Sequence, residues 1–337
     1  MKAWYLIRHG AVDSAFALRE VPDPVPAKGQ VLIRSEGFGL NYADVMARKG
    51  LYREAPAPPC VIGYENVGSV VGLGEGVPQE LLGKRVAAIT RFGGYASMVV
   101  TDHRALVEVP EALGLGEACA LTTQGVTAWY MAMIAYPLRP KQRVLIHSAA
   151  GGVGNLLVQL AVHQGCEVFA VASGQTKMDL LKKYGARHVI DRSRADYAQE
   201  VRSLLNGKHV DVSFNAVAGS TFKKDMALLG DCGTLVMYGG AERGDGFFGA
   251  LRFVWRMGLV VPIALMMRSR SLIGVNMLRV GEHRPDVLAE CLSGTVRANS
   301  EGWLKPIAHE PFTADRLAEA HALLESGRSM GKVAVKW

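Results

Sequence analysis

A run of small residues near the middle of the chain has the spacing of an anion-binding turn. Residues 144–146 (Val-Leu-Ile) are typical of a buried strand, and Ala-Ala-Gly-Gly-Val-Gly follows at 149–154. Small side chains let the backbone approach phosphate oxygens, and the N-terminus of the following helix favours negative charge. The spacing Ala-x-Gly-x-x-Gly therefore predicts that a dinucleotide pyrophosphate is held by Ala150, Gly151, Gly152 and Val153.

The residues after this turn complete a strand-helix-strand unit. Apolar residues recur at helical spacing until Gly165, which predicts a helix that buries Leu156, Leu157, Leu160 and Ala161. Residues 167–172 form a second apolar run. We interpret it as the second parallel strand of a dinucleotide-binding unit.

The end of this second strand predicts which dinucleotide binds. Units that bind NAD usually carry an Asp or Glu there, which accepts hydrogen bonds from the ribose hydroxyls. This chain has Ser173 and Lys177 in that region and no acidic residue from 173 to 178. Both side chains can donate to the 2′-phosphate of NADP, so NADPH is the expected cofactor. Lys177 has an alternative interpretation as a solvated lysine in a first helical turn.

Strands and helices continue to alternate to about residue 240. Apolar strand patterns occur at 189–191, 210–215 and 234–238, which predicts a doubly wound parallel sheet. Ligands of such sheets lie at the carboxyl ends of the strands. The remaining cofactor contacts are therefore expected at the ends of two strands, at Asn215, Val217, Gly239 and Gly240.

Length and composition indicate a two-domain enzyme. The composition, with 49% hydrophobic and 20% charged residues, is ordinary for a globular protein. The length of 337 residues is more than a single hydrophobic core usually serves. The first 110 residues are rich in short strands and turns and predict an irregular β-rich domain. The net charge of +7 comes without an aromatic and basic nucleic-acid motif, so no nucleic-acid partner is expected.

The cysteines and the N-terminus indicate the compartment. The five cysteines stand far apart without paired spacing, which favours a reducing environment. The first residues run directly into strand-like sequence with no apolar signal core. A cytoplasmic protein is the expectation.

Several short motifs, in order along nearly the whole chain, carry a family resemblance. They are GLNYAD (39–44), RKGLY (48–52), PCVIGYE (59–65), GYA (94–96), YGA (184–186), SGR (326–328) and GK (331–332). With the glycine-rich turn, they resemble the medium-chain dehydrogenase/reductase superfamily and its zinc-free quinone oxidoreductase group. Residues 247–277 are further similar to the vesicle amine transport protein branch of that group.

The resemblance implies an α/β architecture in which a Rossmann domain is inserted into a β-rich GroES-like catalytic domain. The expected parts are residues 1–124 (first part of the catalytic domain), 125–266 (NADP-binding domain) and 267–337 (return to the catalytic domain). It also implies a homodimer.

The resemblance also implies the site residues. Thr127 and Asn276 should lie near the nicotinamide, and Arg192 near the adenine, where it could stack, reach a phosphate or be solvated. The substrate side should be lined by Asn41, Tyr42, Tyr52 and Tyr64.

Tyr52 is the expected catalytic donor because a phenol hydroxyl can stabilise an oxyanion or pass a proton. It could equally pack a loop. Asn41 and Asp44 are weaker catalytic candidates that could act through loop hydrogen bonds, and Asp44 could simply cap a helix.

No metal is expected. Zinc alcohol dehydrogenases of this superfamily have a Cys and a His where this chain offers Leu40 or Asn41, and Tyr64. Residues 91–94 leave no room for their four-cysteine lobe, and the nine histidines are scattered.

A site without a Lewis acid favours a substrate that accepts hydride easily. We therefore expect NADPH-dependent reduction of a quinone or an α,β-unsaturated carbonyl compound, whose oxyanion one hydrogen-bond donor can stabilise. The alternative is a nucleotide-binding lipid-transfer or membrane-adaptor protein with little turnover.

Residues 247–267 form an aromatic, basic insertion that could serve three purposes. Its apolar part, 257–267, is shorter than the roughly 20 residues that span a bilayer. It could be a lid over the substrate, a dimer contact or a helix at a membrane surface. Gly258 and Pro262 interrupt it, and a lid is favoured, with Trp255 as a substrate-pocket residue.

Overall fold

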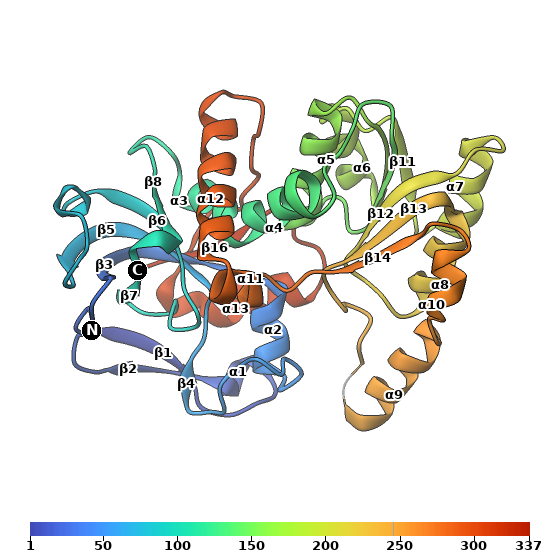
Figure 1. Ribbon diagram of the computed structural model, residues 1–337. Coiled ribbons are helices and arrows are strands. Elements are labelled where there is room, and N and C mark those ends of the chain that lie inside the picture. Colours follow the sequence, from blue (N-terminus) through green and yellow to red (C-terminus); the bar gives the residue numbers. More distant parts are fainter. Residues whose placement is uncertain (245) are drawn as a thin grey trace. The chain divides into compact units, whose positions relative to one another are not determined.

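A six-stranded parallel sheet forms where the sequence alternates short apolar runs with helical ones (Figure 1). In the computed structural model, which describes residues 1–244 and 246–337, the strand order is β11-β10-β9-β12-β13-β14. All described pairings in this sheet are parallel. The strands are β9 (Arg143–Ile146), β10 (Glu167–Ala172), β11 (His188–Asp191), β12 (Val210–Asn215), β13 (Leu229–Met237) and β14 (Ser271–Gly274).

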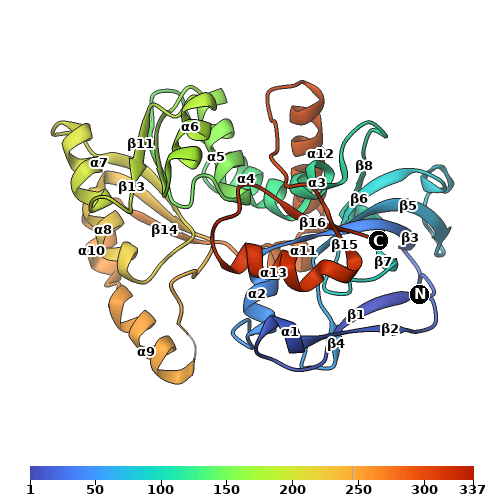
Figure 2. The same cartoon turned by 180° about the vertical axis from the view of Figure 1, so that it is seen from behind.

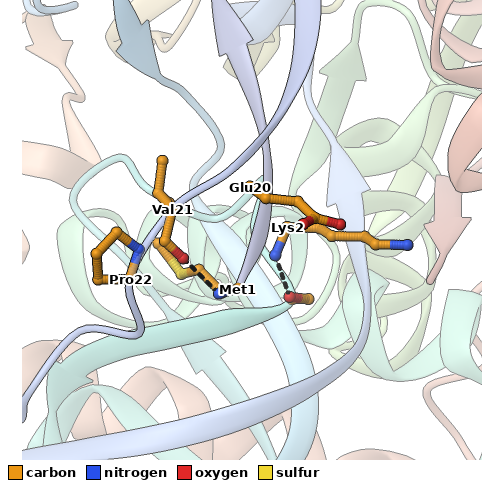
Figure 3. Close-up of a pocket in the computed structure, with 6 residues that line it drawn as sticks. Met1, Lys2, Glu20, Val21 and Pro22 are labelled. Atoms are coloured by element: carbon orange, nitrogen blue, oxygen red, sulfur yellow. Dashed lines mark hydrogen bonds between the residues drawn. The ribbon is translucent and has the colours of Figure 1, made fainter.

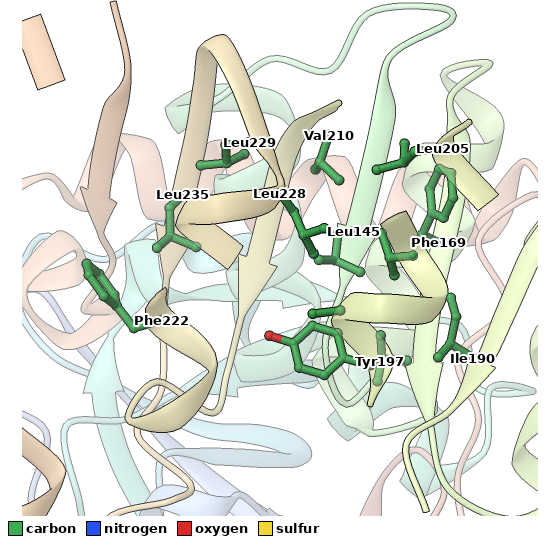
Figure 4. Packing of buried hydrophobic residues seen from close by; sticks show 13 residues of the cluster. Leu145, Phe169, Ile190, Tyr197, Leu205, Val210, Phe222, Leu228, Leu229 and Leu235 are labelled. Atoms are coloured by element: carbon green, nitrogen blue, oxygen red, sulfur yellow. The ribbon is translucent and has the colours of Figure 1, made fainter. Parts of the chain in front are cut away.

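Helices connect these strands and cover the sheet. They are α5 (Gly152–His163), α6 (Gln175–Lys183), α7 (Tyr197–Leu205), α8 (Ser220–Leu228), α9 (Gly246–Met257) and α10 (Pro262–Met266). Figure 4 shows Leu145, Phe169 and Leu235 of the strands packed with Tyr197 and Phe222 of α7 and α8. The predicted doubly wound sheet is confirmed, and the four apolar residues predicted to be buried on α5 are all fully buried.

The β-rich part of the chain forms two further sheets. The larger has the order β15-β16-β3-β5-β6-β8, with β7 also paired to β3, and the smaller has the order β2-β1-β4. The strands are β1 (Lys2–Leu6), β2 (Phe16–Glu20), β3 (Gln30–Leu40), β4 (Cys60–Val61), β5 (Glu65–Leu73), β6 (Arg85–Ile89), β7 (Met98–Asp102), β8 (Leu106–Glu108), β15 (Phe312–Thr313) and β16 (Val333–Lys336).

The C-terminal segment returns to these sheets, as predicted. β16 pairs antiparallel with β3 and parallel with β15. Helix α13 lies against β16 and α2 (Figure 2). The helices of this part are α1 (Val12–Ala15), α2 (Tyr42–Arg48), α3 (Leu115–Cys119), α11 (Met277–His283), α12 (Pro285–Ser300) and α13 (Leu317–Glu325), and α4 (Gly125–Trp129) begins in it.

The chain divides into two units. Unit 1 contains residues 1–127 and 277–337, and unit 2 contains residues 128–276. The sequence placed these divisions at 124/125 and 266/267. The second division falls later because β14, residues 271–274, is the last strand of the parallel sheet and pairs with β13.

Candidate functional site

The glycine-rich turn connects β9 to α5. Ala150 and Gly151 precede α5, and Gly152 and Val153 begin it. Ser148 has a φ of 49°, and a Cβ at Gly154 would lie 2.2 Å from the Ser148 carbonyl oxygen, so a side chain at 154 would collide with the turn. The first amides of a helix lack carbonyl partners within it, and at this turn they can bind phosphate oxygens.

Two cationic side chains gather beside the end of β10. Arg192, just after β11, donates from Nε to the Ser173 hydroxyl over 3.0 Å. Burial and the nearby charge of Arg192 lower the pKa of Lys177. The structure thus brings together Ser173, Lys177 and Arg192 from two neighbouring strand ends. Two positive charges that influence each other favour an anionic ligand in this region.

The turn after β12 is held by a side chain. Asn215 is fully buried, and its Oδ1 accepts hydrogen bonds from the backbone amides of Val217 and Ala218, each over 2.8 Å. Ala218 has a φ of 56°, a left-handed conformation that costs free energy for any residue with a Cβ. The two hydrogen bonds stabilise this conformation.

The turn after β13 lies directly against the turn after β12. A Cβ at Gly239 would be 2.6 Å from the carbonyl oxygen of Ala216, and a Cβ at Gly240 would be 3.2 Å from the Phe253 ring. The strands are parallel, so both turns lie at the same edge of the sheet as the glycine-rich turn. The predicted cofactor residues of unit 2 therefore share one edge.

Unit 1 contains an aromatic cluster at the predicted substrate positions. The rings of Tyr52 and Tyr64 meet edge to face with centroids 6.1 Å apart, and Phe92 lies 5.3 Å from Tyr64. Burial raises the pKa of Tyr52 to about 12 and that of Tyr64 far above its usual range. Both phenols therefore keep their protons at neutral pH. The Tyr64 hydroxyl is buried and has no hydrogen-bond partner.

Asn41 and Asp44 lie at the start of α2. The Asn41 backbone amide donates to Asp44 Oδ2 over 2.7 Å, which is the capping role foreseen as an alternative for Asp44. Burial raises the pKa of Asp44 to about 8. Lys332 Nζ donates to Asn41 Oδ1 over 3.0 Å. Asn41 Nδ2 and Asp44 Oδ1 remain without partners although both are buried.

A buried ion pair, Glu65 with Lys332, adjoins these residues and was not predicted as part of the site. Both side chains are fully buried. Glu65 Oε2 also accepts from the Thr122 hydroxyl over 2.7 Å and from the Thr123 backbone amide over 3.0 Å. The pair holds Lys332 against Asn41 and so fixes the orientation of the Asn41 amide. No local pattern could have found the pair, because the two residues are far apart in the chain.

Four predicted residues lie outside these clusters. Tyr42 and Trp255 are 41% and 77% exposed, and Trp255 lies on α9. Thr127 is buried in unit 1 and donates its hydroxyl to the Thr123 carbonyl oxygen. Asn276 follows β14 in unit 2. The side chain of Phe247, the first residue of the predicted insertion, lies outside the described residues.

One surface pocket of unit 1 is lined by none of these residues. It has a volume of about 570 Å³ and adjoins the N-terminus at the ends of β1 and β2 (Figure 3). Its lining residues are Met1, Lys2, Glu20, Val21, Pro22 and Ser97. None of them belongs to the predicted site.

Among residues 1–244 and 246–337, no group of three or more His, Cys, Asp or Glu side chains is arranged to hold a metal ion. In the same part of the chain, no helix is both long and apolar enough to cross a bilayer. The five cysteines are free.

Two families match successive parts of the chain. Residues 27–136 match the alcohol dehydrogenase GroES-like domain, and residues 152–293 match the zinc-binding dehydrogenase family. The second match covers most of unit 2, and the resemblance places the metal-ligand positions of the superfamily at Leu40 or Asn41, and at Tyr64.

Individual relatives resemble the whole chain. The human synaptic vesicle membrane protein VAT-1 homolog is 32% identical over 320 residues, covering 94% of this chain and 81% of that protein. A 2-haloacrylate reductase from Burkholderia is 28% identical and covers 94% of both chains. The structure of the Thermus thermophilus quinone oxidoreductase, also determined with NADPH, is 28% identical, covers 100% of both chains and has a TM-score of 0.81. With its fold and its landmark residues, this chain belongs to the medium-chain dehydrogenase/reductase superfamily, in the zinc-free quinone oxidoreductase group that resembles VAT-1.

Proposed function

We propose that the protein reduces a quinone or an α,β-unsaturated carbonyl compound with NADPH. The observation that carries this proposal is a pair of buried donors without partners, Asn41 Nδ2 and the Tyr64 hydroxyl. They occur in a chain whose unit 2 has a dinucleotide turn. Buried polar groups are nearly always hydrogen-bonded in a complete protein, so unpartnered donors favour a missing acceptor such as a substrate oxygen.

The edge of the parallel sheet supports NADPH as the cofactor. Gly154 permits the close turn that a pyrophosphate needs, and Ser173, Lys177 and Arg192 fit the 2′-phosphate. In the proposed binding mode, the adenosine half lies at the ends of β10 and β11 and the nicotinamide half lies at the turns after β12 and β13, which the strand order β11-β10-β9-β12-β13 supports. Bound NADPH supplies the hydride.

The residues of unit 1 are suited to stabilise the product of hydride addition. Addition to a quinone or enone places negative charge on the carbonyl oxygen, and fixed donors in a site with little water stabilise that charge. Lys332 holds Asn41 Oδ1, so the two N–H groups of the amide point away from Lys332 and are available to a substrate oxygen. Tyr64 retains its proton because burial raises its pKa. Hydrogen bonds would thus replace a Lewis acid.

Tyr52 and Asp44 are the proposed proton donors. The Tyr52 hydroxyl, with a pKa of about 12, stays protonated and can donate to the reduced oxygen. The Asp44 carboxyl group, with a pKa of about 8, is largely protonated at neutral pH and can restore a lost proton. Tyr42 and Trp255 remain proposed substrate contacts, and Thr127 and Asn276 remain proposed nicotinamide contacts.

A substrate panel tests this function. Purified protein is mixed with NADPH and, separately, with a simple benzoquinone, an enal, an enone and a saturated aldehyde, while NADPH absorbance is followed. We expect turnover of the conjugated acceptors and little reduction of the saturated aldehyde. The proposal fails if none of the conjugated acceptors is reduced, or if a simple alcohol is oxidised with NADP⁺ at a comparable rate.

The surface of α9 and α10 favours a second function, contact with an anionic membrane. Ten of the 16 large apolar side chains exposed in the described residues lie between Phe248 and Met267. Trp255 is 77% and Leu259 is 96% exposed. Residues 246–267 contain two arginines and no acidic residue, so the segment suits anionic lipid headgroups. Glu242 pairs with Arg256, which leaves Arg252 as the better cation to test.

Sedimentation with vesicles tests the second function. Wild-type protein should sediment with vesicles that contain phosphatidylserine and remain in solution with phosphatidylcholine alone. Arg252→Glu should weaken sedimentation, while Arg202→Glu, the same charge change on α7, should not. The proposal of membrane contact is wrong if the wild-type protein does not sediment with anionic vesicles. A dimer that Trp255→Ser converts to a monomer would instead assign the surface to a second copy. A lid would be indicated if Trp255→Ser weakened the binding of long-chain quinones and left the binding of small quinones unchanged.

A further inference from the structure

A fully buried carboxylate lies in the core of unit 2 and is surrounded by donors. Asp225 of α8 accepts hydrogen bonds from His147 Nε2 over 3.0 Å and from the Tyr197 hydroxyl over 2.8 Å. It also accepts from the Ser213 hydroxyl over 2.8 Å and from Asn215 Nδ2 over 2.6 Å. Asp225, Ser213 and Asn215 are fully buried. Four donors therefore meet at one side chain.

Asp225 determines which way the Asn215 amide points. Asn215 Nδ2 faces Asp225 and also donates to the Thr221 hydroxyl oxygen over 2.9 Å. Its Oδ1 must then face the turn, where it accepts from the amides of Val217 and Ala218. A reversed amide would direct N–H groups against the N–H groups of the turn. The left-handed conformation of Ala218 would then lose its support.

The same carboxylate reaches the glycine-rich turn from the other side. His147 directly precedes Ser148, the residue with a φ of 49° that opens this turn. Its backbone amide donates to the Phe214 carbonyl oxygen over 3.0 Å, and its ring is held by Asp225. The carboxylate thus contacts residues next to both turns, one after β9 and one after β12.

We propose that Asp225 is a positioning residue that fixes the turn after β12 for the nicotinamide half of the cofactor and ties it to the pyrophosphate turn. The proposal rests on the cofactor site of the proposed function. Asp225 does not contact the cofactor; it acts through Asn215 and His147.

Asp225→Asn tests this role with little change in size. The new amide is an acceptor on one side only, so two of the four donors lose their partner, and the Asn215 amide can reverse. We expect NADPH to bind about tenfold more weakly, the equivalent of one hydrogen bond lost in the complex. The binding of 2′-phospho-ADP-ribose, which lacks the nicotinamide, should change less than about threefold. Both are measured by calorimetric titration.

Three further variants make the result specific. Asn215→Ala should give the same selective loss as Asp225→Asn, and the double variant should lose no more than either single variant, because the two residues act as one unit. Ser213→Ala removes one donor with minimal disturbance and should give a smaller selective loss. Asp211→Asn is the control, because Asp211 bonds Arg143 at the opposite end of β12. It should leave both titrations unchanged.

The outcomes separate this role from simple support of the fold. Equal weakening of both ligands by Asp225→Asn, or no weakening of either, would overturn it. If Asp225→Asn does not fold, the proposal stands or falls on whether Asn215→Ala and Ser213→Ala lose NADPH selectively. A wild-type protein that binds neither ligand refutes the proposed function, and this inference with it. A wild-type protein that binds both leaves the function intact whatever the variants do.

Discussion

The two units differ in how completely their buried polar side chains are hydrogen-bonded. In unit 2, Asp225 is matched by four donors, which come from three different segments of the chain: the end of β9, β12 and α7. In unit 1, Asn41, Asp44 and Tyr64 are just as buried, yet each has a polar atom without a partner.

This difference supports our interpretation of the unit 2 cluster as a structural scaffold and of the unit 1 cluster as the proposed reaction site. A satisfied network rigidifies a core and loses stability when any member is removed. An unsatisfied donor already costs free energy in the folded protein, so removing it should cost little stability while removing whatever it binds. Stability and activity should therefore respond in opposite directions in the two clusters.

The largest effect is expected from Asp225→Ala. Four donors lose their acceptor in a site closed to water, so the free energy of unfolding should fall by about 3 kcal/mol or more. Urea denaturation measures this fall. Asp211→Ala, which removes a partly exposed carboxylate on β12, should lower it by much less. Equal falls in the free energy of unfolding of the two variants would show that the buried network contributes no more to stability than the partly exposed carboxylate.

Tyr64→Phe should show the opposite pattern. The variant removes a hydroxyl without a partner, so Tm should be unchanged or raised, while kcat with a quinone or enone should fall by about 100-fold, as for loss of an oxyanion donor. Tyr5→Phe in the same unit serves as the control. A variant with normal kcat and lowered Tm would show that the Tyr64 hydroxyl serves the fold.

Asp44→Asn should change how the stability of the protein depends on pH. The folded-state pKa of Asp44, about 8, lies above its usual 3.8, so the folded protein keeps a proton that the unfolded chain has released. Stability from this group is present at low pH and is lost as pH rises toward 8. Between about pH 6 and about pH 8, the wild type should lose about 2 kcal/mol relative to Asp44→Asn. Parallel pH profiles of the two proteins would show that Asp44 is ionised throughout.

The smallest effect is expected from the removal of Lys177, one of the two cationic residues near the end of β10. Lys177→Ala should weaken NADPH binding about tenfold and leave NADH almost unchanged, because only NADPH has the 2′-phosphate to which a charge-assisted hydrogen bond forms. Fluorescence titration with both cofactors measures the ratio, and Lys182→Ala on the same helix is the control. If wild-type protein binds NADPH and NADH equally, the assignment of this end of the site is wrong.

The sequence predicted the features of the fold that depend on local pattern. The turn at 148–151, the helix that follows it and the strand at 167–172 were predicted because their apolar spacing and small residues are continuous in the chain. The parallel sheet followed from the alternation of such segments. The late position of β14 was not foreseen, since its membership depends on pairing with β13 and not on its own four residues.

The buried polar clusters could not be predicted in the same way. Asp225 follows two lysines on α8, a pattern typical of a solvated helix face, and only packing against β12 reveals its four donors. Lys332 meets Glu65 from the far end of the chain, which no local pattern indicates. Asn41 and Tyr64 were predicted as site residues from the family resemblance, but their lack of partners appears only when the surrounding side chains are in place.

Unit 1 is built from two segments that are far apart in the chain, and this affects how it folds during synthesis. Residues 1–127 leave the ribosome before β16 exists, so residues 37–40 of β3 lack the strand with which they pair and Glu65 has no lysine, whereas unit 2 is synthesised in one piece. At about 5 to 20 residues per second, the interval between Thr127 and Lys332 lasts roughly 10 to 40 seconds. Throughout it, a half-built sheet with an open edge is exposed to other nascent chains. Chaperones that cover strand edges should therefore contact the first 127 residues until the final strand arrives.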